Sequence, residues 1–198
     1  MCNLENSEHL AFLSTDTTGF GLDDELLRIT IMDSDGNILL NQMVFPPNKI
    51  SWNEAQLIHG ISTDDIEINA ISLDELHEKL KSVLANYTHI VMYNADFHKR
   101  FLPSSVLENK SCICVMQWSI PYVNNHPSYA HLSAYLKLPV LAAFLDVEIS
   151  DIIRNSINNC NLTRKVWIEM LRSAKHLEND VGDQLLISSN INYISYES

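Results

Sequence analysis

Small polar side chains and one carboxylate follow the first apolar run of the sequence. Residues 10–13 are apolar, and the next six residues read Ser-Thr-Asp-Thr-Thr-Gly, with Asp16 as the carboxylate. A carboxylate at the end of a buried strand can ligate a hard divalent cation such as Mg²⁺. It can equally form an ion pair or a turn contact. The sequence therefore predicts a polar site at this strand end, with both alternatives open for Asp16.

Two later segments carry further chemistry. Residues 93–102 read Y-N-A-D-F-H-K-R-F-L, and residues 154–163 read R-N-S-I-N-N-C-N-L-T. His98 could ligate zinc or manganese together with Asp16, but two ligands are too few for a closed site, which favours a hydrogen-bonded His98. Arg154 could clamp a phosphate or carboxylate bidentately or form an ion pair with Asp16. Asp96 is interpreted as a helix-start carboxylate.

The aromatic side chains have two interpretations. Trp52, Trp118 and Trp167 could stack nucleic-acid bases, whereas packing in the core or at an interface is the more common role. His59 lies in an Ile-His-Gly-Ile stretch at residues 58–61, where it could simply support the end of a helix.

The charge is strongly uneven along the chain of 198 residues. Residues 1–80 hold 15 Asp and Glu against 3 Lys and Arg, and residues 81–198 hold 10 of each, which together give the net charge of −12. An acidic surface repels the phosphate backbone and argues against tight passive DNA binding. It does not exclude an enzyme that recruits divalent metal, and it could serve only solubility.

The remaining composition indicates a cytoplasmic protein. The start of the chain shows no export signal, and no apolar run approaches the length of a membrane span. The four cysteines, Cys2, Cys112, Cys114 and Cys160, lack zinc-site spacing and are interpreted as reduced thiols, with Cys112 and Cys160 as packing residues.

The hydrophobic pattern predicts a mixed α/β domain. Apolar runs predict strands over residues 10–13, 26–32, 38–45, 90–93 and 112–116, with a hairpin turn at 33–37. Capping signals and apolar stripes predict helices over residues 51–58, 72–84, 97–107 with an interruption near Pro103, 129–138, 151–159 and 162–174. We assign residues 1–175 to one domain. Residues 176–198 are a C-terminal extension that could be an edge strand, a tail or an oligomer contact.

In order and spacing, the three polar segments resemble the DnaQ-like 3′–5′ exonucleases of the DEDDh type, and most closely the exodeoxyribonuclease X group. The stretch from Cys112 to Leu138 adds to this resemblance, which covers roughly residues 10–175. It implies a ribonuclease H-like fold with a mixed central sheet flanked by helices. Family features that remain and could bind a ligand are Thr17, Thr18, His59 and Asn94.

The resemblance also exposes five departures from the family's catalytic residues. Four carboxylates of the family hold two divalent metals that activate water and stabilise the leaving oxygen, and a histidine acts as general base. In this chain the matching positions are Ser14, Asp16, His98, Arg154 and Asn159. One carboxylate remains, and a guanidinium about 6 Å from a divalent ion would repel it by about 5 kcal/mol. The resemblance therefore implies no intact catalytic residue and no cofactor, with Mg²⁺ or Mn²⁺ as the alternative.

Three functions remain open at this point. The first is a degenerate exonuclease domain that binds a protein, or alternatively a nucleic-acid end, in the cleft that forms the active site in the family. The second is an active 3′–5′ exonuclease or phosphodiesterase with an altered metal site around Asp16 and His98. The third is a regulatory module whose acidic N-terminal half mimics nucleic acid or docks on a basic partner. None involves a membrane, and the oligomeric state is left open.

Overall fold

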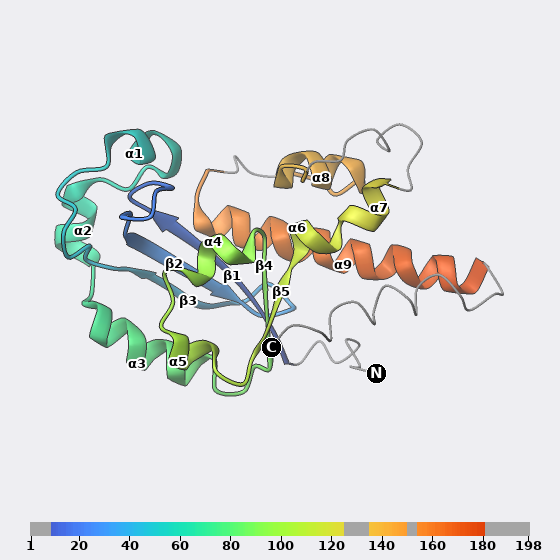
Figure 1. Cartoon of the computed structure of the whole chain (residues 1–198), viewed down its shortest axis with the longest axis horizontal. Coiled ribbons are helices and arrows are strands. Elements are labelled where there is room, and N and C mark those ends of the chain that lie inside the picture. The colour runs from blue at the N-terminus through green and yellow to red at the C-terminus, as the bar shows by residue number, and fades with distance from the viewer. Residues whose placement is uncertain (1–8, 125–134, 150–153, 181–198) are drawn as a thin grey trace.

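A five-stranded mixed sheet forms the centre of the computed structural model, which describes residues 9–124, 135–149 and 154–180. The strand order is β3-β2-β1-β4-β5 (Figure 1). The strands are β1 (Leu10–Thr17), β2 (Leu26–Met32), β3 (Ile38–Met43), β4 (His89–Met92) and β5 (Ser111–Cys114). β1, β2 and β3 pair antiparallel, whereas β4 pairs parallel with β1 and β5.

The first three strands form the predicted meander. The turn between β2 and β3 is held by the Asp33 carboxylate, which accepts hydrogen bonds from the backbone N–H groups of Asp35 and Asn37. Gly36 adopts φ 93°, a left-handed conformation that glycine tolerates without strain. The hairpin predicted at residues 33–37 is therefore present.

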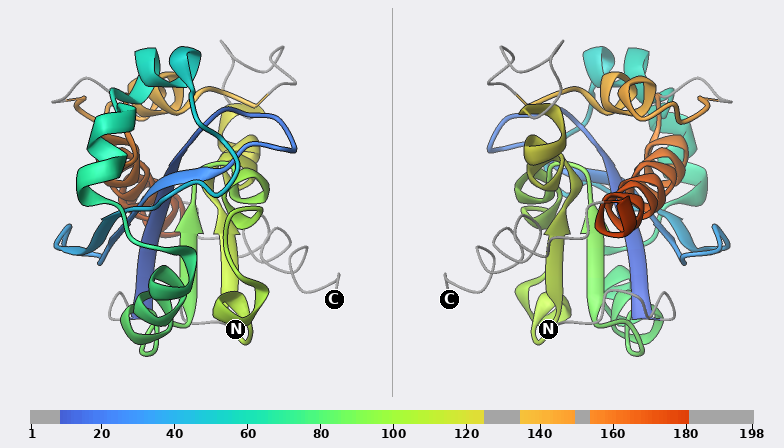
Figure 2. Two further views of the ribbon diagram at one scale, coloured as in Figure 1. Left: turned by 90° about the vertical axis from the view of Figure 1, so that its left-hand side faces the viewer. Right: turned by 90° about the vertical axis from the view of Figure 1, so that its right-hand side faces the viewer.

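Alternate residues of β1 pack into two different cores. Leu10 and Phe12 belong to the core that α9 (Ser156–Asp180) and α8 (Leu138–Phe144) cover. Ala11 and Leu13 belong to the core on the opposite face, which α3 (Leu73–Val83) covers. Figure 2 shows α9 and α3 on the two sides of the sheet. This two-faced burial follows from the period of two along a strand.

Two short helices, α1 (Asn53–His59) and α2 (Thr63–Asn69), lie between β3 and α3. They pack on a small cluster of Leu27, Trp52, Ala55, Ile61 and Ile66. The capping box expected at residues 51–54 does not form, because the N-cap of α1 is Trp52 with no side-chain hydrogen bond. A complete box forms instead at α2, between Ser62 and Asp65.

Several helix boundaries differ from those expected. The helix expected over residues 97–107 divides into α4 (Ala95–Lys99) and α5 (Ser104–Leu107). β5 ends before the short helices α6 (Val115–Trp118) and α7 (Ile120–Asn124). Residues 156–159 and 162–174 of the two helices expected near the C-terminus belong to one helix, α9, whereas residues 151–153 of the first lie outside the described residues.

The remaining predictions concern residues at the edges of the described ranges. Of the helix expected over 129–138, residues 129–134 lie outside the described residues, and residues 135–137 are not helical. The proposed domain boundary at 175/176 falls inside α9 and stays a prediction, since residues 181–198 also lie outside the described part. Among the described residues, no helix has the length and apolarity needed to cross a membrane.

Candidate functional site at the end of the first strand

Four polar side chains from β1 and β2 form a buried patch beneath the start of α9. Ser14 and Asp16 continue the row of Leu10 and Phe12 along β1, so strand alternation places them on the face that α9 covers. The strand register pairs Ser14 with Thr30 and Asp16 with Arg28. All four are buried, with exposed fractions from 0% for Thr30 to 8% for Arg28.

An ion pair between Asp16 and Arg28 lies at the centre of this patch. Arg28 Nε donates a hydrogen bond of 2.7 Å to Asp16 Oδ2, and Arg28 Nη2 lies 2.6 Å from the same oxygen. The side chains are 10% and 5% exposed. Nη2 is close enough for an ion pair but lacks an aligned hydrogen bond, so the guanidinium is engaged through one carboxylate oxygen and not as a two-oxygen fork.

The first residue of α9 completes this polar cluster. Ser156 Oγ lies 3.1 Å from Arg28 Nε and 2.9 Å from Thr30 Oγ1. The Asn155 side chain caps the helix start by accepting a hydrogen bond of 3.0 Å from the backbone N–H of Asn158. The cluster of Asp16, Arg28, Thr30 and Ser156 therefore fastens the N-terminus of α9 to the sheet.

The structure corrects the expected partner of Asp16. The sequence left Arg154 as either an anion clamp or an ion-pair partner of Asp16; the ion pair forms with Arg28 instead, and Arg154 is exposed just before α9. Asn159, the other family position in this segment, is half-buried in the first turns of α9. Arg28 was missed because its side chain meets Asp16 only through the antiparallel register of two strands.

His98 lies on the other face of β1. Its Nδ1 is 2.8 Å from Thr15 Oγ1, and Thr15 points away from the face that carries Ser14 and Asp16. Burial lowers the pKa of His98 to about 4, although a hydrogen bond with the Tyr93 backbone partly opposes this shift. The imidazole is therefore neutral at pH 7, and the structure does not bring it onto the same face as Asp16.

His59 connects the end of α1 to the end of β1. Its Nε2 donates to the Thr17 carbonyl at 3.2 Å, and its Nδ1 accepts from the backbone N–H of Ile61 at 3.0 Å. Burial lowers the pKa of His59, with the Asp16 charge acting in the opposite direction. Gly60 ends the helix in a left-handed conformation. This geometry gives His59 the supporting role that the sequence left open.

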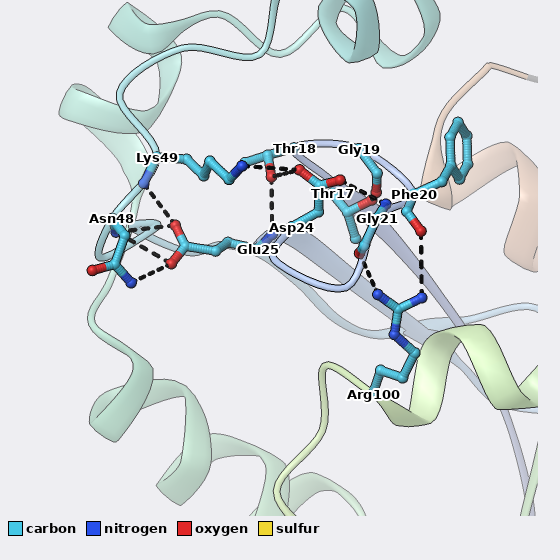
Figure 3. A network of polar contacts seen from close by, with 10 residues as sticks. All are labelled: Thr17, Thr18, Gly19, Phe20, Gly21, Asp24, Glu25, Asn48, Lys49 and Arg100. Atoms are coloured by element: carbon cyan, nitrogen blue, oxygen red, sulfur yellow. Dashed lines mark hydrogen bonds and ion pairs between the residues drawn. The ribbon is translucent and has the colours of Figure 1, made fainter.

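The two threonines of the Thr-Thr-Gly stretch hold the loop between β1 and β2 (Figure 3). Thr17 Oγ1 donates to the Gly19 carbonyl at 2.6 Å, and Thr18 Oγ1 donates to Asp24 Oδ1 at 2.8 Å. Asp24 Oδ2 also accepts from the Gly21 N–H at 2.7 Å. Burial raises the pKa of Asp24, but the hydrogen bonds and the Lys49 charge outweigh it and leave the pKa below its usual value.

Two further contacts fix the ends of this loop. The Glu25 carboxylate accepts hydrogen bonds from the backbone N–H groups of Asn48 and Lys49. Arg100, directly after α4, donates to the carbonyls of Phe20 and Gly21 (Figure 3). The loop is therefore anchored on both sides, and the hydroxyls of Thr17 and Thr18 are already engaged within it.

Asn94 starts α4 in a left-handed backbone conformation, with φ 61° and ψ 63°. It is exposed and makes no side-chain cap hydrogen bond to the helix. Its position lets the chain turn sharply from β4 into α4, which directs His98 toward Thr15.

The residues of the cluster do not fit a pair of divalent cations. Within residues 9–124, 135–149 and 154–180, no three His, Cys, Asp or Glu side chains lie close enough to hold a metal. The one carboxylate of the cluster already contacts a guanidinium at 2.6 Å. A divalent ion on that carboxylate would lie about 4 Å from the guanidinium, with a repulsion of about 8 kcal/mol at an effective dielectric near 20.

The sheet order and flanking helices define a ribonuclease H-like fold. The structure is similar to exonuclease X in complex with 5′ overhanging duplex DNA, with a TM-score of 0.62 and 19% identity over 84% of this chain and 93% of that chain. It is also similar to E. coli exonuclease I in complex with a dA16 oligonucleotide, with a TM-score of 0.63 and 14% identity over 83% and 40% of the two chains. These likenesses confirm the predicted fold.

Sequence comparison points to the same class of protein. The chain is 38% identical over 91 residues to the uncharacterized exonuclease CP81 of Escherichia phage 186. The match spans 46% of this chain and 45% of the phage protein. No protein-family model matches the chain. Together with the fold, this match confirms the predicted resemblance to DnaQ-like exonucleases.

Proposed function

We propose that this chain is a catalytically degenerate DnaQ-like exonuclease domain that acts as a binding module, with a protein as its principal partner. The buried ion pair between Asp16 and Arg28 carries this proposal. It neutralises the one carboxylate that remains of the family's four, and it places a permanent cation beside it. A cytoplasmic location remains the prediction from the sequence.

The energetics of the cluster support loss of metal chemistry. A hydroxyl, Ser14, stands where the family has its first carboxylate, and the Asp16 carboxylate is held by Arg28 at 2.7 Å. Mg²⁺ needs hard oxygen ligands in near-octahedral geometry. Replacing the guanidinium by a metal would require Arg28 to leave a site in which its side chain is 10% exposed. A buried charge without its partner is unfavourable.

The alternative is an active nuclease or phosphodiesterase with an altered metal site around Asp16 and His98. The geometry gives it no support, because the two side chains lie on opposite faces of β1 and His98 is engaged by Thr15. A nucleic-acid end remains the second ligand class in our proposal. The similar exonuclease X and exonuclease I structures are DNA complexes, whereas the acidic N-terminal half opposes phosphate binding.

A nuclease assay tests the proposal directly. Labelled single-stranded DNA and duplex DNA with a 5′ overhang are incubated with the full chain in Mg²⁺ or Mn²⁺, beside an Asp16→Ala variant purified in the same way. We expect no turnover above that variant, and no saturable Mn²⁺ binding by calorimetry. Metal-dependent digestion that disappears in Asp16→Ala would overturn the proposal.

A further inference from the structure

The outward surface of α1 and α2 combines large apolar side chains with carboxylates. Singly exposed apolar residues are common on proteins, but here they recur on two consecutive helices. Leu57 is 82% exposed, Ile58 48% and Ile68 80%. We define the α1–α2 surface by these three residues and the exposed acids Glu54, Asp64 and Glu67.

Helical spacing places these side chains on two short stripes. Glu54, Leu57 and Ile58 are at positions i, i+3 and i+4 of α1. Asp64, Glu67 and Ile68 repeat the same spacing on α2. Residues with this spacing share one face of a helix. Each helix therefore presents an acidic residue and an apolar residue one turn later.

In each helix one side is already used for packing, roughly opposite Leu57 in α1 and Ile68 in α2. Ala55 of α1 and Ile66 of α2 are buried in the same small cluster, which also includes Trp52. The helices lie next to each other at one corner of the molecule (Figures 1 and 2). Leu57 and Ile68 therefore face away from the core that holds the helices in place, and Ile58 lies at the edge of the packed side of α1.

The charge around the α1–α2 surface has one sign. Between Lys49 and Lys79 the sequence contains seven Asp and Glu and no Lys or Arg. Lys49 itself lies beside Asp24, at 3.7 Å. Among the residues that the structure describes, no ion pair joins Glu54, Asp64 or Glu67 to a cation.

We propose that the α1–α2 surface docks a basic amphipathic segment of a partner protein. Apolar side chains of that segment would cover Leu57, Ile58 and Ile68, and its Lys or Arg side chains would meet the surrounding acids. The inference rests on the proposed function, because it names the partner class of the same binding module. Helix-in-groove and helix-on-helix contacts use this i, i+3, i+4 pattern of anchors.

Charge excludes the other occupants that the chain itself suggests. A second copy would bring the same acidic surface against itself, which like-charge repulsion disfavours. Residues 181–198 and 1–8 contain acids and no Lys or Arg, so neither chain end offers the complementary charge. Nucleic acid carries the wrong charge as well. A basic protein segment meets both the apolar and the acidic parts of the surface.

A synthetic helical peptide of Leu and Lys, with Leu at i, i+3 and i+4, serves as the probe. Its binding to the full chain is measured by fluorescence anisotropy at low and raised salt. A matched peptide with Ser in place of Leu keeps the charge and removes the apolar anchors, and labelled oligothymidylate tests the nucleic-acid outcome. We expect the Leu–Lys peptide to bind in a salt-dependent way, with the Ser peptide and oligothymidylate much weaker.

Paired variants locate the binding site. The double variant Leu57→Ser with Ile68→Ser should bind the Leu–Lys peptide about 10- to 30-fold more weakly than the wild type, as expected for loss of interface anchors. Val140→Ser with Ile149→Ser removes apolar side chains that are 45% and 41% exposed elsewhere and should leave the affinity unchanged. The unfolding midpoint of each variant is measured in parallel, because substitutions at exposed positions should leave the midpoint unaltered.

Charge variants complete the test. The double variant Glu54→Gln with Glu67→Gln should bind the Leu–Lys peptide more weakly, and its affinity should depend less on salt. Glu148→Gln should change neither quantity. Equal binding by the Ser peptide, an equal loss in both apolar pairs, or oligothymidylate binding that depends on Leu57 and Ile68 would overturn the inference. The nuclease assay reports on Asp16 and is independent of these residues. DNA turnover with intact peptide binding would therefore refute only the proposed inactivity.

Discussion

Removing Arg28 should destabilise the fold far more than removing a surface cation. The Arg28→Met change keeps much of the side-chain volume but leaves the Asp16 carboxylate, which is 5% exposed, without its cation. Breaking a buried pair from one side is unfavourable by about 3–5 kcal/mol. That is a large part of the roughly 5–15 kcal/mol that stabilises a domain. We therefore expect a free energy of unfolding lower by about 3–5 kcal/mol.

The double change Arg28→Met with Asp16→Leu should recover most of this loss. Replacing both partners of a buried ion pair by apolar groups is often neutral or stabilising. Urea unfolding followed by circular dichroism gives the free energy for each single variant, the double variant and the wild type, and the cycle isolates the pairwise coupling. We expect a coupling of about 3 kcal/mol or more.

A solvent-exposed pair of similar length provides the matched control. Lys99 Nζ lies 2.8 Å from Asp96, but these side chains are 39% and 75% exposed. Lys99→Met should therefore lower the free energy of unfolding by less than about 1 kcal/mol. A stabilising role for the buried pair is contradicted if Arg28→Met destabilises no more than Lys99→Met, or if the double variant is as unstable as the sum of its two single changes.

Three further predictions follow from the site and its loop. Restoring the family residues together should permit Mn²⁺ binding by calorimetry only when Arg28→Met is added, because the guanidinium would repel the ion by about 8 kcal/mol; equal binding with Arg28 retained would contradict this. The restoring changes are Ser14→Asp, Asp16→Glu, Arg154→His and Asn159→Asp; His98 is left unchanged, because its side chain lies on the other face of β1. Burial lowers the pKa of His98 to about 4, so His98 binds a proton more readily in the unfolded chain than in the folded one. The stability of the fold is therefore not reduced by this titration above about pH 6.5, the ordinary pKa of histidine. We expect about 3 kcal/mol to be lost as the pH falls to 4, and urea unfolding of His98→Gln should show a flatter pH profile. Gly19→Ala would place a Cβ 2.8 Å from Asp24 Cγ and should lower the free energy of unfolding by about 1–2 kcal/mol through lost loop hydrogen bonds. Gly21→Ala, with its nearest contact at 3.1 Å, should have a smaller effect, and urea unfolding of the two variants measures the difference.

Local features of the fold were readable from the sequence. The Asp33–Asn37 turn, the end of α1 at Gly60 and the start of α3 at Ser72 all depend on residues a few positions apart. Backbone conformations at such positions follow from short-range sterics and side-chain hydrogen bonds. The order of the three polar segments identified the fold class, which the structural likeness then confirmed.

Helix boundaries near the site were harder to predict from the sequence. The stretches 151–159 and 162–174 were expected as separate helices, but the Asn155 cap and the Ser156 contacts with Arg28 and Thr30 begin a continuous α9. Those contacts join residues more than a hundred positions apart. Local periodicity contains no information about such partners, so the pattern alone suggested a weak start and a break.

From the sequence alone, the family resemblance predicts one carboxylate where the family has four, with Thr17, Thr18 and Asn94 retained. How these groups contact one another became visible only in the folded chain. Strand register paired Asp16 with Arg28, and strand alternation turned Thr15 and its partner His98 to the other face. Register and face depend on how whole strands and helices pack, which is why the cation beside Asp16 came from β2 and not from the segment that the motif spacing indicated.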